Sequence, residues 1–79
     1  MAPHPPDADP ALATVLRRLR TKRGETQEDL GYRIRLTAGS LSRIEQGQAN
    51  PTWSTVRKIA EGLGVTLVEL ARAVEREED

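Results

Sequence analysis

The chain lacks most of the residue types on which metal sites, disulfides and base stacking depend. Its 79 residues contain no cysteine, one histidine and only two aromatic side chains, Tyr32 and Trp53. Without cysteine, neither a disulfide framework nor a thiolate metal site is possible, and one histidine does not build a metal site either. We therefore expect no metal and no cofactor. The lack of an aromatic series also argues against binding to single-stranded nucleic acid.

Long apolar runs and catalytic groupings are missing as well. No segment approaches the roughly 18 apolar residues that a membrane span needs, and the opening residues MAPHPPDADP lack the basic and apolar regions of a signal peptide. No paired carboxylates, nucleophile with a base or phosphate-binding glycine loop can be assembled. The sequence predicts a cytoplasmic protein that is not an enzyme, has no membrane partner and is too short to hold a separate domain for a small-molecule ligand.

The net charge of zero hides an uneven distribution along the chain. Residues 11–58 hold ten Lys or Arg against four Asp or Glu, a net charge of +6. The acidic residues that balance this charge lie in residues 1–10 and 59–79. A basic central segment is what a nucleic-acid-binding domain requires, so the overall neutrality does not exclude one.

Apolar residues recur at helical spacing in five short segments, and no strand pattern is present. Asp9, Thr26, Thr37, Thr52 and Thr66 are placed to cap the N-termini of these helices. The pattern predicts helices at about 10–23, 27–34 and 38–46, a fourth that follows Thr52 and a fifth that follows Thr66. We expect an all-α fold class, with a disordered tail at 1–9, a compact five-helix domain at 10–76 and an acidic end at 77–79.

The segment from Thr26 to Gly47 has the pattern of a helix-turn-helix. Five apolar residues, at positions 30, 34, 36, 41 and 44, can converge from two short helices and the turn between them. Two helices held at an angle by a turn of three or four residues are typical of this motif. The outer face of the second helix is left exposed, and an α-helix has the width to enter the major groove of duplex DNA.

Four blocks of residues carry a resemblance to a known family. They are TQEDL at 26–30, LSRIEQG at 41–47, NPT at 50–52 and LGV at 63–65. With these blocks, residues 11–74 resemble the lambda-repressor-like, Cro or XRE type helix-turn-helix family. The resemblance implies a five-helix lambda-repressor-like domain with the helix-turn-helix at helices two and three. It also implies a sequence-specific transcriptional regulator, a repressor or a controller, that binds double-stranded DNA through the major groove as a homodimer and associates with the nucleoid when bound.

The resemblance also suggests which residues contact DNA. The set comprises Gln27, Arg35, Thr37, Ala38, Gly39, Ser40, Ser42, Arg43, Asn50 and Thr52. Because Ala38, Gly39 and Ser42 offer little to a base edge, Arg43 carries most of the donor capacity, either to a guanine or to a phosphate or nearby carboxylate. Gln27 is expected to contact a phosphate or to remain solvated, and Thr52 either contacts DNA or caps its helix.

Other family features fall on residues outside the set expected to contact DNA. Arg20 lies at the edge of an apolar stripe, and the family commonly pairs an arginine there with the glutamate that here is Glu45, which predicts a partly buried salt bridge. The dimer interface is expected at Leu67, Leu70 and Val74.

Two positions depart from the family pattern, and Trp53 carries an expectation of its own. Arg35 stands where the family usually has glycine in the turn, and Gly31 replaces the usual alanine. Trp53 occupies an apolar position at the start of the fourth helix, which favours packing in the core or burial at its edge.

The subclass stays open from the residues alone. A chain with only the binding domain resembles both the controller proteins of restriction-modification systems and the phage-type repressors. The alternative from another class is an antitoxin-like module that mainly holds a partner protein, with DNA binding secondary. Such a module needs an exposed apolar patch or a segment that orders on binding.

Overall fold

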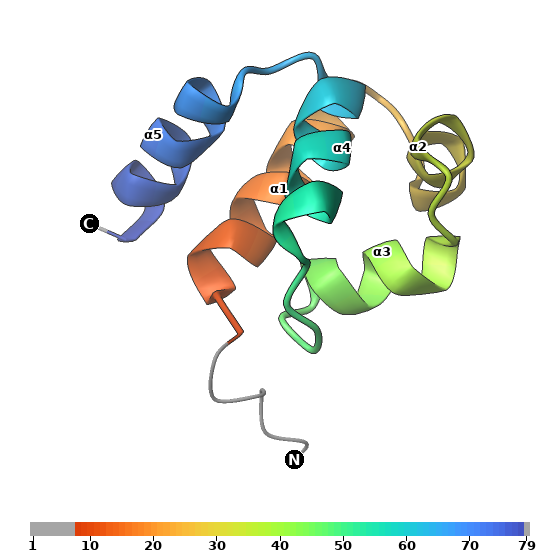
Figure 1. Cartoon of the computed structure of the whole chain (residues 1–79), viewed down its shortest axis with the longest axis horizontal. Coiled ribbons are helices and arrows are strands. Elements are labelled where there is room, and N and C mark those ends of the chain that lie inside the picture. The colour runs from red at the N-terminus through yellow and green to blue at the C-terminus, as the bar shows by residue number, and fades with distance from the viewer. Residues whose placement is uncertain (1–7, 79) are drawn as a thin grey trace.

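The computed structural model describes residues 8–78 and folds them into five α-helices, with no strand in that range (Figure 1). The helices are α1 (Pro10–Lys22), α2 (Gln27–Ile34), α3 (Ala38–Glu45), α4 (Trp53–Leu63) and α5 (Leu67–Glu78). The expected all-α, five-helix fold class is confirmed. Within the described range, no helix is both long enough and apolar enough to cross a bilayer.

The polar residues before the helices cap them as their positions suggest. The Asp9 side chain accepts a hydrogen bond from the Leu12 amide at 3.1 Å, so α1 begins at Pro10. Thr26 and Asp29 form a reciprocal capping box at the start of α2, with both hydrogen bonds between 3.0 and 3.1 Å. At the start of α3 the Thr37 side chain accepts a hydrogen bond from the Ser40 amide. Each such cap is worth about 1 kcal/mol, which matters in helices of eight residues.

The core takes side chains from every helix. Val15 of α1, Leu30 of α2, Leu41 of α3 and Ile59 of α4 are each at most 1% exposed, and Leu70 of α5 is 3% exposed. Each such burial contributes about 1.5 to 3 kcal/mol relative to an exposed side chain. Helix α1 packs against α3, α4 and α5, whereas α2 packs against α3 and α4. The α2–α3 pair is therefore held at one side of the bundle, with the outer face of α3 uncovered (Figure 1).

The structure adds detail to three of the expectations for the C-terminal half. Helix α5 continues to Glu78, so the boundary expected at 76 falls inside it, and Glu77 pairs with Arg18. Leu70, one of the three residues expected at the dimer interface, is a core residue of the single chain and only 3% exposed, because α5 directs it against α1 and α4. Trp53 is 63% exposed rather than packed in the core. Residues 1–7 of the expected tail lie outside the described residues.

Arg35 ends α2 in the left-handed region, with φ 61° and ψ 44°, and is the one non-glycine residue with positive φ in residues 8–78. That conformation costs an L-residue about 1 kcal/mol or more relative to glycine. We expect Arg35→Gly to raise the free energy of unfolding by about 1 kcal/mol in chemical denaturation. Arg35→Ala keeps the Cβ and is the matched control. An equal increase in the free energy of unfolding for both variants would contradict the explanation that the left-handed backbone is strained at Arg35.

Candidate nucleic-acid interface

Helix α3 has one buried side and one exposed side. Leu41, Ile44 and Glu45 are buried, while Gly39 and Arg43 on the opposite side are exposed. The buried side fixes the rotation of the helix about its axis, so the same residues always face outward. This arrangement gives a helix-turn-helix a presented surface of fixed register.

The N-terminal end of α3 offers few unused groups. The Thr37 hydroxyl oxygen accepts from the Ser40 amide at 3.0 Å, and the same hydroxyl donates to Ser40 Oγ at 2.9 Å. Ala38 is half-buried and carries only a methyl group. Gly39 is exposed but has no side chain. Most of the side-chain donors on α3 therefore lie further along the helix, from Ser42 onward.

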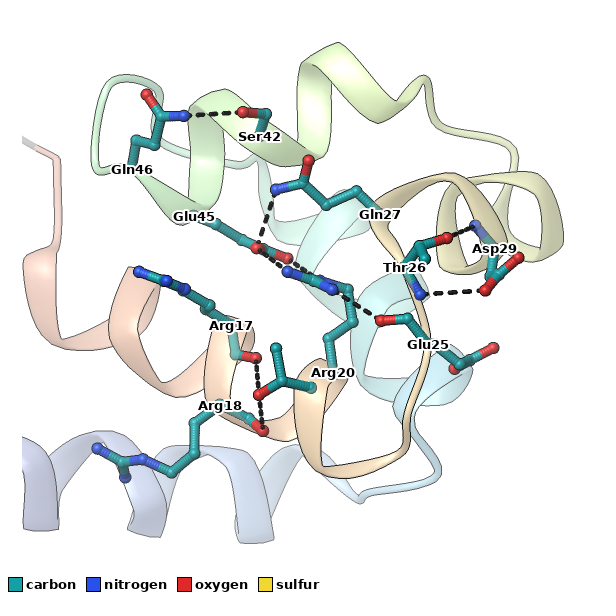
Figure 2. Close-up of polar contacts among 11 residues, drawn as sticks. Arg17, Arg18, Arg20, Glu25, Thr26, Gln27, Asp29, Ser42, Glu45 and Gln46 are labelled. Carbon is teal, nitrogen blue, oxygen red and sulfur yellow. Dashed lines mark hydrogen bonds and ion pairs between the residues drawn. The ribbon is translucent and has the colours of Figure 1, made fainter.

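Arg20 and Glu45 form a bidentate ion pair between α1 and α3 (Figure 2). Arg20 Nε lies 2.8 Å from Glu45 Oε2, and Arg20 Nη2 lies 2.8 Å from Glu45 Oε1. The third guanidinium nitrogen donates to the Glu25 carbonyl at 2.7 Å. The side chains are only 11% and 3% exposed. The hydrogen bond to Glu45 raises the pKa of Arg20 above its usual value.

Gln27 belongs to the same network. Its Nε2 donates to Glu45 Oε1 at 3.1 Å, so Glu45 joins α1, α2 and α3 (Figure 2). A shallow hollow of about 480 Å³ runs beside this network, lined by Arg17 of α1, Gln27 of α2, and Ser42 and Gln46 at the end of α3. The network therefore holds the first turn of α2 against the C-terminal end of α3. A helix N-terminus such as that of α2 favours a phosphate.

The remaining candidate residues are spread over two other places. Arg35 lines a separate hollow of about 330 Å³ with Lys58 and Glu61, away from Gln27. Asn50 and Thr52 are exposed in the loop after α3, and the Thr52 hydroxyl accepts from the Thr55 amide at 3.2 Å, which is its capping role. The structure thus brings Gln27 and Ser42 together at one hollow, with Arg43 exposed on the outer side of α3, and places Arg35 at a different hollow.

A second ion-pair network engages some of the basic residues. Glu25 binds Arg33 through both carboxylate oxygens, at 2.9 and 2.6 Å, and Arg33 also donates to the Gly62 carbonyl at 2.7 Å. The hydrogen bond from Arg33 holds the pKa of Glu25 below its usual value. In contrast, Arg17 and Arg43 have no ion-pair partner within residues 8–78. Their charges are available to an external polyanion.

Two features of this surface were not anticipated from the sequence. Gln46 lies on the same side as Gly39 and Arg43, and its Nε2 donates to Ser42 Oγ at 2.9 Å. The helical spacing, four residues after Ser42 and seven after Gly39, was the available signal. The contact between Gln27 and Glu45 had no such signal, because the two residues are 18 positions apart on different helices.

Comparison with known proteins gives a consistent result. A family model described as "Helix-turn-helix domain" matches residues 11–73. The chain is 43% identical over 53 residues to the uncharacterized HTH-type transcriptional regulator y4dJ of Sinorhizobium fredii, covering 67% of this chain and 69% of that protein. It is 36% identical over 63 residues to the control protein C.MunI of Mycoplasma sp, and this match covers 78% of this chain and 85% of that protein.

A solved structure is similar over nearly the whole length. The restriction-modification controller protein C.Esp1396I, crystallised as a tetramer in complex with its natural 35 base-pair operator, superposes with a TM-score of 0.84 at 29% identity. The match covers 92% of this chain and 96% of that chain.

Proposed function

The chain belongs to the helix-turn-helix domain family, and on that premise we propose that it is a sequence-specific transcriptional regulator that binds double-stranded DNA through the major groove. The observation that carries this proposal is the outer face of α3, which is exposed, fixed in rotation and holds Arg43 without an ion-pair partner in the described chain. Similarity to a controller protein crystallised on its operator supports it.

In this proposal the contacts divide into two kinds. Arg43 reads a base, because an arginine can bond guanine O6 and N7 together. Gln27 contacts a phosphate, and Arg17 adds a charge at the hollow that both residues line. The Ser40 hydroxyl, which accepts a hydrogen bond from Thr37, donates to another phosphate. Phosphate contacts fix the register of the protein on the duplex but do not specify sequence.

Arg43→Ala is expected to weaken discrimination at one base pair of each half-site by about 1 to 3 kcal/mol. The measurement is selection of bound duplexes from a random pool by the wild type and by the variant. Arg72→Ala, which removes an exposed arginine of α5, is the matched control and should leave the motif unchanged. If the wild type enriches no motif, the proposed function is refuted. A motif that survives Arg43→Ala unaltered refutes the role of that side chain.

We further propose that the regulator acts as a homodimer on a roughly palindromic site. One copy presents few base-reading side chains, so two copies on half-sites about 34 to 36 Å apart are needed for useful discrimination. An apolar groove of about 350 Å³ lies between α1, α4 and α5, lined by Trp53, Leu67 and Val74 among others. Trp53 at its rim is 63% exposed, and a symmetric pair buries the same patch on both copies.

Trp53→Ala is expected to shift the monomer–dimer equilibrium toward the 8.7 kDa monomer in sedimentation at micromolar concentration. An aromatic anchor at the centre of an interface is commonly worth 2 kcal/mol or more, which raises the dissociation constant by about 30-fold or more. Tyr32→Ala, which removes the other exposed aromatic residue, is the control and should not change the equilibrium. A wild type that remains a monomer would refute the dimer, and an unchanged Trp53→Ala dimer would move the interface elsewhere.

A further inference from the structure

The outer face of α3 carries its side chains in its C-terminal half. Gly39, Arg43 and Gln46 lie along this face and are all exposed. A Cβ at Gly39 would come no closer than 3.9 Å to any neighbour, the Thr37 hydroxyl oxygen, so packing does not require glycine there. The bare first turn leaves room for a duplex to approach closely, and close approach brings Arg43 and Gln46 within reach of base edges.

Gln46 is already oriented before any ligand binds. Its Nε2 donates to Ser42 Oγ at 2.9 Å, one helical turn earlier on α3 (Figure 2). A side-chain amide has two N–H donors and one acceptor oxygen. Ser42 engages one of these donors, and the residue is exposed, so one N–H and Oε1 remain for a ligand. This pair matches the N7 acceptor and the N6 donor that adenine presents in the major groove.

We propose that Gln46 is a specificity-determining residue that reads the adenine of an A·T pair close to the base pair contacted by Arg43. This inference rests on the proposed DNA-binding function. Gln46 follows Arg43 by three positions, a rise of about 4.5 Å along the helix axis, which is near the spacing of successive base pairs, about 3.4 Å. Both side chains therefore reach neighbouring base pairs from one helix.

A phosphate contact by Gln46 is the competing role, and its surroundings disfavour that role. Gln46 is the C-cap of α3, where the helix dipole places partial negative charge. This partial charge disfavours a phosphate, whereas a base edge that offers one donor and one acceptor is compatible with it. Ser42 acts as the positioning residue for the amide.

The test is selection of duplexes from a random pool by the full chain. Gln46→Ala should lose an adenine preference at one position of each half-site by about fivefold to 100-fold, with an unchanged melting temperature because the side chain is exposed. Gln46→Glu should replace adenine by cytosine there, since a carboxylate accepts from cytosine N4. Ser42→Ala should reduce the adenine preference by a smaller factor. Gln48→Ala, an exposed glutamine beyond α3, is the matched control and should keep the wild-type motif.

The possible outcomes distinguish a failure of this inference from a failure of the proposed DNA-binding function. No enriched motif with the wild type refutes DNA reading altogether. A wild-type motif that Gln46→Ala and Gln46→Glu both preserve overturns the role of Gln46 alone. Uniformly weaker binding to all sequences by Gln46→Ala, with the motif kept, shows a phosphate contact and also overturns it.

Discussion

Glu45→Ala is expected to destabilise the domain by about 3 to 5 kcal/mol, the typical cost of removing one partner of a buried ion pair. The carboxylate is 3% exposed and accepts three hydrogen bonds, two from Arg20 and one from Gln27. Without it, the guanidinium of Arg20 stays inside the fold, 11% exposed, with its Nε and Nη2 donors unpaired. The free energy of unfolding of a small domain is only about 5 to 15 kcal/mol, so the substitution removes a large part of the stability.

Thermal unfolding measures this prediction directly. In a domain of this size each 1 kcal/mol lowers the melting temperature by about 4 to 8 °C, so Glu45→Ala should melt at least about 12 °C below the wild type. Arg20→Ala should behave similarly, since it leaves the carboxylate buried without its counter-ion. Arg18→Ala breaks the exposed pair with Glu77 and is the matched control, expected to cost less than about 1 kcal/mol. A Glu45→Ala variant with wild-type thermal stability that loses DNA binding would contradict the structural role.

The local parts of the fold were predictable because their causes are local. Thr26, Thr37 and Thr52 each accept an amide hydrogen bond three residues ahead, which is a property of sequence spacing. The helix starts after them are therefore correct. The end of α5 has a cause that is not local: the helix continues through Glu77, which is held by Arg18 of α1, 59 positions away. A contact of that kind has no signature within the helix itself.

The errors concern which apolar residues the bundle covers. Leu67, Leu70 and Val74 form one stripe on α5, and spacing alone does not tell which of them meet the core. The crossing of α5 over α1 buries Leu70 and leaves the other two half-buried beside the groove. Trp53 has a large apolar side chain of the kind found in cores, but as the first residue of α4 it lies at the rim of the bundle. Burial at both positions depends on how whole helices cross.

Gly31, which stands where the family usually has alanine, lies against the turn between α2 and α3. A Cβ at this position would overlap the Leu36 carbonyl oxygen, far inside van der Waals contact, and would lie 3.4 Å from the Leu36 carbonyl carbon. The oxygen cannot withdraw easily, because the amides of Arg35 and Leu36 both donate to the Gly31 carbonyl and fix the turn. The glycine therefore permits the close approach of the turn to α2.

Gly31→Ala is accordingly expected to destabilise the domain by about 1 to 3 kcal/mol through overpacking, even though alanine is the better helix former by about 0.5 to 1 kcal/mol. Gly39→Ala is the matched control on α3, because its Cβ meets only open space and a contact at 3.9 Å. There the same substitution should be neutral or stabilising. Denaturant unfolding of both variants measures whether each substitution lowers or raises the free energy of unfolding. Equal increases at both positions would contradict the steric account.

The Gly31→Ala variant should also lose DNA affinity when folded, at a temperature below its transition. Relief of the overlap requires the turn at Arg35 and Leu36 to move, and that turn sets the angle between α2 and α3. Any change of this angle separates Gln27 from Arg43, so phosphate contacts and base contacts no longer fit one duplex. Gly39→Ala leaves the angle intact, and its effect on DNA binding is confined to the new methyl group. A folded Gly31→Ala variant with wild-type affinity would show that the turn accommodates a methyl group without rotating α3.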